Sequence, residues 1–421
     1  MKNNCKLKIA GWPAVVTIVL GGALPMMAVE TPVDSVAVAM EQPSDKVEKK
    51  DFRSRWNFTG YAEISALRNF DRLGNRRSNP TDDYSAWELH LPMTGLWIEF
   101  DCGKGWTVGT EMHFENMATV AMNGPGTAAS REVDWALNFE LAEFWIQKSF
   151  SEKANIKVGW ISTPVGQTND LPTDFFGITR PEEGPAFLPL DCSAAAIDFN
   201  GVAGDWGYEV MAIPGLTGYD FGNSSWRYGK SVFEQSLSRV YAGAFRLTNT
   251  SVKGLEMALS GEFGGGYTMA EIEEEDSRKI TNGLYLAAFG ASYNDHNVIA
   301  RGSFQYGYLS NHCDSWKRIE DFRHDMHAMS AGAEVGYDMF ALNSRLRGQQ
   351  KFYLFGRYAW RQSRDYVGTA SPGSWNVDQR VSFGVNWMPI PSIVVKGECG
   401  FGFGADPTRC FAGVSVGWCP F

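Results

Sequence analysis

Histidine and acidic side chains are the groups in this sequence that could perform acid–base chemistry. His90 and His113 lie inside apolar stretches, and Glu88 and Glu111 stand two residues before them. A hydrolase would also need a serine or a second carboxylate within reach of such a histidine. Because no serine stands out as that partner, we expect that the chain is not an enzyme.

Metal chemistry has a weaker basis in the sequence. His324 and His327 are three positions apart, with His312 and Asp314 nearby, and the cysteines form no CxxC pair. A structural zinc site needs four converging ligands. Glycine-rich nucleotide-binding patterns that lead into a helix are also missing. We therefore interpret these histidines as polar loop residues and expect no metal and no cofactor.

Charged side chains recur at alternate positions of apolar stretches, an arrangement that could line a water-filled path. In residues 297–310, for example, Arg301 alternates with Val298, Ala300 and Phe304. Successive side chains of a strand point to opposite faces, so the charged positions share one face. By this parity, the candidates for a lumen-facing position include Arg246, Arg301, Arg357, Arg380, Lys396 and Glu334, together with Glu63, Glu111, Glu209, Glu256 and Glu398. Rings of one charge sign set ion preference, and this mixed set, which leans acidic, does not form an anion filter.

The stretches that must hold these residues are long strands. Residues 139–150 and 155–166 alternate apolar and polar side chains, and about sixteen such stretches follow Trp56. Strands of soluble sheets are typically about 5–6 residues long, whereas a tilted strand that spans a bilayer needs about 9–11. The length of these stretches favours strands that cross a membrane, with their apolar face toward lipid.

The connections between the strands alternate in length. Residues 101–105 and 151–154 are short, whereas residues 68–84, 117–138 and 167–191 are long. This alternation is typical of bacterial outer-membrane barrels, in which short periplasmic turns alternate with long extracellular loops. We therefore predict an all-β protein, a transmembrane antiparallel β-barrel of about sixteen strands with long extracellular loops. Closing the sheet pairs every strand edge, which lipid requires.

The first 51 residues differ in composition from the rest. Lys2, Lys6 and Lys8 precede an apolar run at 9–24, and small residues follow. This order is typical of a secretory signal peptide, with cleavage plausible after Ala28. A membrane-anchor helix is the alternative, which the glycines and the proline of residues 21–25 disfavour. The predicted organisation is a signal peptide (1–28), a flexible periplasmic segment (29–51) and an outer-membrane barrel (52–421). The net charge of −10 argues against a nucleic-acid partner.

Several stretches between residues 56 and 360 resemble one family. They include GYAEISAL at 60–67, LPMTGLWIEFDCGKGWTVGTEMHFEN at 91–116, ELAEFWIQKSFSEKANIKVGWISTPVGQTN at 140–169 and KFYLFGRY at 351–358. These stretches resemble porins of the Bacteroidetes outer membrane, which are grouped near the phosphate-selective porins O and P. The resemblance implies a sixteen-stranded barrel, often a homotrimer, whose third long loop folds inside and narrows the pore.

The third long loop of this chain is residues 167–190, which contain four prolines and no apolar period. Phe175, Phe176, Phe187 and Leu188 could anchor it on the barrel wall. Candidates for the pore constriction are Asp170, Asp174, Arg180, Glu182 and Glu183. A loop that covers the outer mouth is the alternative. The arginines and lysines expected of a phosphate filter do not align here, so we do not carry over the preference for phosphate.

The expected function is that of an outer-membrane porin. It would form a water-filled channel for passive diffusion of small hydrophilic solutes or ions. Its expected partners are those solutes, outer-membrane lipid, lipopolysaccharide and two further copies of the chain in a homotrimer. The alternatives are a structural or adhesive barrel without transport and a barrel hydrolase. The sequence does not decide between anions and cations.

Overall fold

The computed structural model describes residues 52–70, 87–115, 120–122, 138–166, 176–178, 193–213, 240–272, 276–313, 323–364, 375–404 and 409–418. The predicted signal peptide (1–28) and the predicted periplasmic segment (29–51) lie outside these residues. No helix among the described residues is long and apolar enough to cross a membrane. The described chain consists almost entirely of strands.

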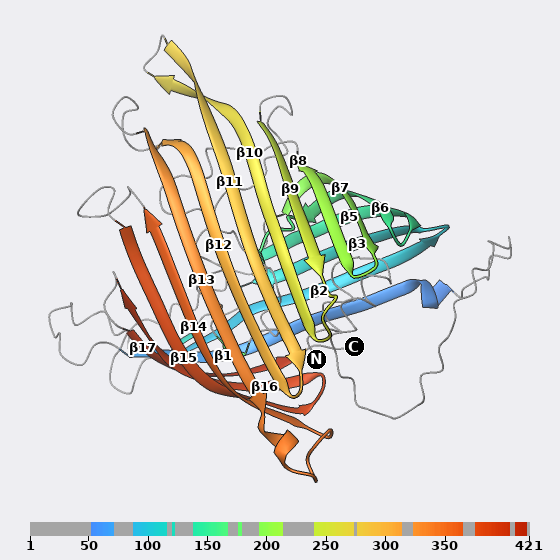
Figure 1. Ribbon diagram of the computed structural model, residues 1–421, viewed down its shortest axis with the longest axis vertical. Coiled ribbons are helices and arrows are strands. Elements are labelled where there is room, and N and C mark those ends of the chain that lie inside the picture. Colours follow the sequence, from blue (N-terminus) through green and yellow to red (C-terminus); the bar gives the residue numbers. More distant parts are fainter. Residues whose placement is uncertain are drawn as a thin grey trace.

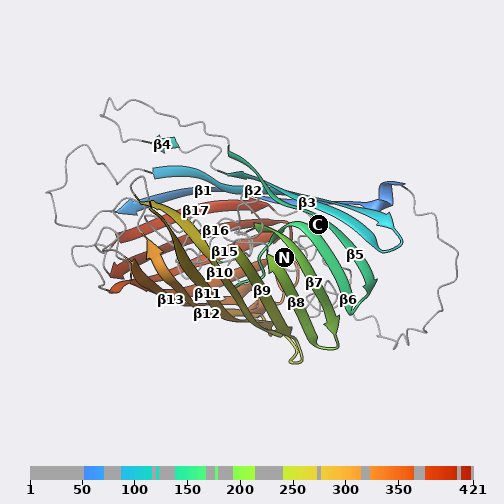
Figure 2. The same cartoon turned by 90° about the horizontal axis from the view of Figure 1, so that it is seen from above.

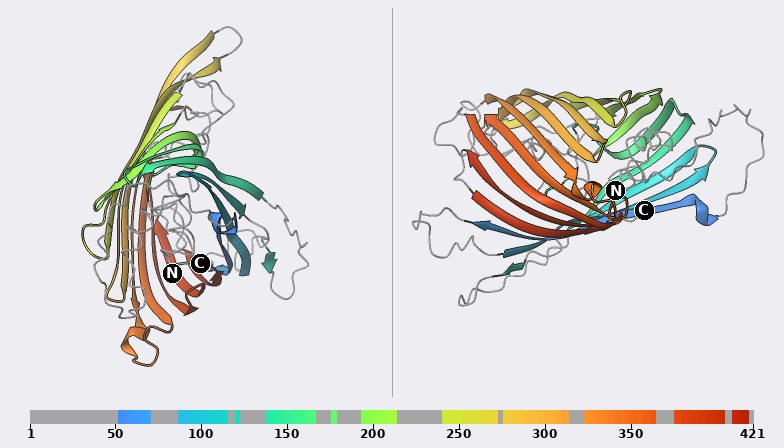
Figure 3. Two further views of the ribbon diagram at one scale, coloured as in Figure 1. Left: turned by 90° about the vertical axis from the view of Figure 1, so that its right-hand side faces the viewer. Right: turned by 60° about the horizontal axis from the view of Figure 1, so that its bottom comes forward.

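A short 3-10 helix, η1 (Phe52–Arg55), precedes the first strand. The strands of the first half are β1 (Trp56–Phe70), β2 (Trp87–Gly103), β3 (Trp106–Glu115), β4 (Val120–Met122), β5 (Asn138–Ser151), β6 (Ala154–Ser162), β7 (Ser193–Ala203), β8 (Trp206–Ile213) and β9 (Val240–Asn249). Those of the second half are β10 (Leu255–Ile272), β11 (Asp276–Asp295), β12 (Val298–Cys313), β13 (Arg323–Asp338), β14 (Lys351–Arg364), β15 (Trp375–Ile390), β16 (Ile393–Gly404) and β17 (Arg409–Trp418). A second 3-10 helix, η5 (Met339–Leu342), follows β13 at the end of the barrel opposite the tip of the β10–β11 hairpin (Figure 1; Figure 3).

The strands close into a barrel. Seventeen strands form one sheet, and without the three-residue β4, which pairs with β2, they leave the predicted sixteen. Each of these strands is antiparallel to its neighbour in the ring. The ring closes where β17 pairs with β1, with Ile64 opposite Val416. Figure 2 shows β1–β3 and β10–β13 on opposite sides of the barrel. The predicted fold class is confirmed.

The two faces of the wall separate apolar from polar side chains. On β15, Phe383 is 55% exposed, whereas the side chain of Ser382 is fully buried. On β6, Val158 is 47% exposed, whereas Lys157 is buried. An exposed apolar face around a closed ring suits contact with lipid, because the strands have no unpaired edge. The prediction of which alternate side chains face outward and which face inward is correct for these two strands.

Tryptophans gather at the end of the barrel that carries the short turns. Trp106 and Trp206 are the first residues of β3 and β8, and Trp387 and Trp418 lie at the same end of β15 and β17. All four are at least 40% exposed. Amphipathic indole rings favour the membrane–water interface, so this group marks one predicted aromatic belt.

Some predicted boundaries are wrong. The sequence also predicts a long connection at 268–282, but this stretch is largely a hairpin, because β10 and β11 pair without interruption as far as Ile272 and Asp276. Figure 1 shows this hairpin projecting beyond the neighbouring strands. Strand β6 ends at Ser162 and not at Gly166, because the chain turns off the wall at Thr163, whose carbonyl accepts from the N–H of Val165.

The exposed face generates a prediction about stability. Arginine in place of Phe383 should lower the free energy of unfolding by about 2–4 kcal/mol, the cost of a lipid-facing arginine at the bilayer midplane. Ser303→Arg, on the polar face of β12, is the control and should lower the free energy of unfolding much less. Denaturant unfolding of both variants in lipid vesicles tests this, and equal losses would contradict the assigned faces.

The turns generate a prediction about topology. The β2–β3 turn holds Lys104 at a positive φ of 54°, and we predict that it faces the periplasm. A peptide tag inserted after Lys104 should therefore escape surface labelling of intact cells. A tag after Asp314, in the connection that follows β12, should be labelled. Labelling of the first tag would place the short turns on the wrong side.

Candidate functional site

The segment that follows β6 enters the barrel. Residues 163–166 are all buried. The N–H of Gly166 donates to Oγ of Ser260 on β10 at 2.9 Å, and Nη2 of Arg246 on β9 donates to the carbonyl of Gly166. Both side chains lie on the polar face of their strands. These bonds hold the base of the segment against the inner face of the wall.

Apolar contacts explain why the chain turns inward at this point. Val165, 3% exposed, belongs to a buried cluster with Trp145, Ile161, Met211 and Ile213. These residues line the inner side of β5, β6 and β8, where water would otherwise contact them. Burial of such a side chain contributes about 1.5–3 kcal/mol. The cluster therefore favours the inward path over an extension of β6.

The next described part of the segment, residues 176–178, lies against the opposite wall. The N–H of Phe176 donates to Oε2 of Glu334 at 3.4 Å, and the N–H of Ile178 donates to Oε2 of Glu398 at 2.7 Å. Nζ of Lys396 donates to the carbonyl of Gly177 at 3.3 Å. In the ring order, β14, at the middle of this wall, is eight strands from β6 in either direction. Residues 163–166 and residues 176–178 are therefore held on opposite walls of the barrel.

Aromatic packing adds to these hydrogen bonds. The ring of Phe176 stacks on Phe355 with centroids 5.4 Å apart, and it contacts Tyr353 at 5.3 Å. Gly336 on β13 makes room for it, since a Cβ atom there would overlap the Phe176 ring. Offset aromatic pairs contribute about 0.5–1.5 kcal/mol beyond the area that they bury. Phe176 is the main apolar anchor of residues 176–178.

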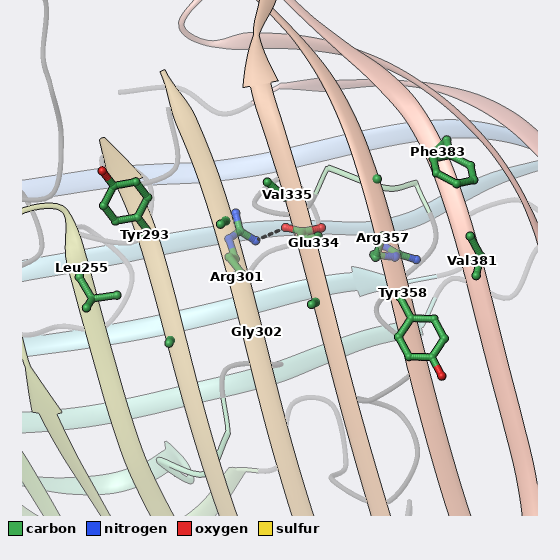
Figure 4. A pocket seen from close by; sticks show the side chains of 14 residues that line it. Leu255, Tyr293, Arg301, Gly302, Glu334, Val335, Arg357, Tyr358, Val381 and Phe383 are labelled. Atoms are coloured by element: carbon green, nitrogen blue, oxygen red, sulfur yellow. Dashed lines mark ion pairs between the residues drawn. The ribbon is translucent and has the colours of Figure 1, made fainter. Parts of the chain in front are cut away.

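The wall that receives the segment carries three buried ion pairs. Nη1 of Arg301 is 2.9 Å from Oε1 of Glu334, a pair drawn in Figure 4. Two further pairs join Arg357 Nη2 to Glu398 Oε1 at 3.5 Å, and Lys396 Nζ to Glu63 Oε2 at 3.2 Å. The charges balance, and we call this part of β12–β16 and β1 the balanced wall. Its carboxylates form these ion pairs, and those of Glu334 and Glu398 also accept hydrogen bonds from N–H groups of the segment.

The outer side of the same strands has an open, largely apolar depression. The small residues Gly302, Ala333 and Gly356 are among those that line it, together with the larger side chains of Tyr293 and Phe383; Figure 4 shows Gly302 between Tyr293 and Phe383. Arg301, Glu334 and Arg357 of the balanced wall are also among the residues that line this depression.

The predicted site residues fall into two groups. The candidates for the constriction, Asp170, Asp174, Arg180, Glu182 and Glu183, lie outside the described residues, as do the anchor candidates Phe175, Phe187 and Leu188. Of the predicted lumen-facing set, Arg301, Glu334, Arg357 and Lys396 meet in the balanced wall. Arg246 holds the base of the segment. Arg380 is half-buried and lies 5.1 Å from the centroid of the Phe411 ring.

Sequence reasoning missed the contacts that hold Phe176. Gly336 stands on the polar parity of β13, beside Glu334, and a glycine inside a strand indicates close approach of another group. That signal could have indicated where the segment docks. The pairing of Phe176 with Tyr353 and Phe355 has no local signal, because the residues are far apart in the chain.

Comparisons with known proteins concern the fold. The sequence matches no protein-family model and no curated protein. Among solved structures, the outer membrane channel DcaP of Acinetobacter baumannii is 12% identical with a TM-score of 0.54, over 87% of this chain and 97% of that one. The anion-selective porin from Comamonas acidovorans is 11% identical with a TM-score of 0.52, over 87% and 99%. A loop L8 deletion mutant of OmpT from Vibrio cholerae is 8% identical with a TM-score of 0.52, over 87% and 100%. The chain has the fold of outer-membrane porins.

The attachment of the segment generates a prediction. Glu398→Ala removes the acceptor of the Ile178 N–H and the carboxylate that pairs with Arg357. Breaking a buried pair from one side costs about 3–5 kcal/mol. The variant should therefore unfold at lower denaturant concentration, and proteinase K should cut it faster within residues 167–190. Asp295→Ala, on the β11–β12 turn, is the control; equal cleavage of the two variants would contradict the attachment.

Proposed function

We propose that the protein is an outer-membrane porin that forms a water-filled channel for passive diffusion of small hydrophilic solutes or ions. The observation that carries this proposal is the segment that leaves β6 and is held on the wall eight strands away. A segment across a barrel divides its cross-section. We therefore infer that residues 167–190 narrow the passage.

The chemistry of the two faces supports a channel. Buried charged side chains such as Glu63, Arg357 and Lys396 lie on the inner face of the strands, while the outer face carries exposed apolar side chains such as Phe383 and Val158. A narrow passage with low-dielectric walls strengthens the field of the charges along it, so the inner charges would act on passing ions. The candidates Asp170, Asp174, Arg180, Glu182 and Glu183 would add charge where the passage is narrowest.

The location follows from the same features. We propose that residues 1–28 direct export and that the apolar outer face then sits in the outer membrane, in contact with lipid and lipopolysaccharide. Assembly as a homotrimer stays a prediction; one of the similar structures is a trimer form of OmpT from Vibrio cholerae. Membership among Bacteroidetes porins near the phosphate-selective porins O and P likewise stays a prediction. The light-scattering mass of the detergent-extracted protein measures the assembly.

A structural or adhesive barrel is the second candidate, and a hydrolase is the third. His113 and Glu111 form a buried pair on β3, with Tyr61 and Trp97 beside the imidazole ring. A barrel without transport would show no conductance in a lipid bilayer. A hydrolase would show turnover that is lost with His113. That the chain is not an enzyme remains a prediction.

Planar-bilayer recording of the purified protein tests the channel and its narrowing together. If residues 167–190 narrow the passage, deletion of residues 174–183 should raise the single-channel conductance and speed the uptake of larger solutes. A deletion of equal length within residues 217–239, after β8, is the control and should change both much less. Equal conductance of the two folded variants would contradict narrowing by residues 167–190. No conductance from the intact protein would refute the channel and favour a structural barrel.

A further inference from the structure

The charge inside the barrel is unevenly distributed. On the balanced wall, each of Arg301, Arg357 and Lys396 pairs with a carboxylate. The inner face of β3–β10 differs, because its buried carboxylates outnumber its cations. The carboxylates are Glu111, Glu143, Asp198, Glu209 and Glu262. The lysine and arginine side chains facing them are Lys157 and Arg246.

These acidic groups form one connected set. Glu111 stands opposite Glu143, and Glu209 stands opposite Arg246 in the strand register. The carboxylates of Glu143, Asp198 and Glu209 interact electrostatically with one another. The set of acidic side chains is therefore continuous from β3 to β8.

Lys157 does not balance this charge. Its register partner is Asp198, and its ammonium group lies 5.3 Å from the centroid of the Trp145 ring. It is one cation among the carboxylates of Glu143, Asp198 and Glu209. Carboxylates without a matched cation keep their attraction for a mobile one.

A second observation points to the ligand. Five buried oxygen atoms on β5–β7 accept no hydrogen bond in the described part of the chain. They are Oε2 of Glu143, Oε1 of Gln147, Oδ1 of Asn155, Oδ1 of Asp198 and Oδ1 of Asn200. Their side chains are at most 6% exposed. We call this set the acceptor wall.

The amide groups of this set direct their donors to the protein. Nδ2 of Asn155 donates to the carbonyl of Asn200 at 3.1 Å, and Nδ2 of Asn200 donates to Oδ2 of Asp198 at 2.6 Å. Nε2 of Gln147 donates to Oγ of Ser149 at 3.2 Å. The atoms left over are therefore oxygens, which suit a cation and not an anion. A buried acceptor without a partner costs about 1–3 kcal/mol, so a species that satisfies it is stabilised.

We propose that the acceptor wall attracts small inorganic cations into the barrel and gives the channel a preference for cations over anions. Carboxylate and amide oxygens are ligands of hard cations, and a wall of one charge sign sets ion preference. Among the described residues, no group of three His, Cys, Asp or Glu side chains converges as a metal site would. The proposal rests on the channel function.

Reversal potentials of the full chain in planar bilayers under a KCl gradient test the preference for cations. The intact channel should favour K⁺ over Cl⁻. The double variant Glu143→Gln, Asp198→Asn keeps the shape of both side chains and an oxygen acceptor for each neighbouring donor. It should lower the permeability ratio of K⁺ to Cl⁻ by about fivefold, the change that corresponds to about 1 kcal/mol of lost attraction for a charge 4 Å away in water.

Two further variants make the test decisive. Lys157→Gln removes the cation beside the wall and should raise the permeability ratio of K⁺ to Cl⁻. If the double variant does not fold, this variant tests the proposal in its place. Asp295→Asn removes the same charge at the β11–β12 turn and should leave the ratio unchanged. A preference of the intact channel for Cl⁻ would overturn the proposal, as would equal ratios in all variants. No conductance at all would instead refute the channel function.

Discussion

The barrel depends on one constraint, which is that no backbone N–H or C=O group can stay unpaired in lipid. A row of antiparallel strands always leaves two open edges, and only the pairing of β1 with β17 removes them. Once the ring is closed, the pleat sends alternate side chains to lipid and to the interior. The exposed Phe383 and the buried Ser382 beside it follow from that geometry.

The same constraint shapes the interior. A segment that enters a barrel brings N–H groups that need acceptors, and the carboxylates of Glu334 and Glu398 supply them. Those carboxylates already pair with Arg301 and Arg357, so one set of charges holds both the wall and the segment. The opposite side of the barrel holds residues 163–166 through Ser260 and Arg246, and it also carries the five buried oxygens of the acceptor wall, which accept no hydrogen bond within the described residues.

The sequence predicted most of the strands closely because their signal is local. For example, the sequence predicts a strand at residues 240–249, and β9 spans Val240–Asn249. The errors occur where distant contacts override the local pattern. Strand β6 ends early because Val165 finds an apolar cluster inside the barrel, and β10 and β11 run on because each supplies a partner for the other.

The sequence by itself determined the strands, the alternation of their faces and the ends that carry short turns, because each follows from the chemistry of neighbouring residues. It also placed Arg301, Arg357, Lys396 and Glu334 on one face. Only the tertiary structure decided which of them meet. Arg357 and Glu398 are separated by β15, and Lys396 meets Glu63 only because the ring closes. The docking of Phe176 was decided in the same way, since a contact across the barrel depends on the path of the whole ring and on no local pattern.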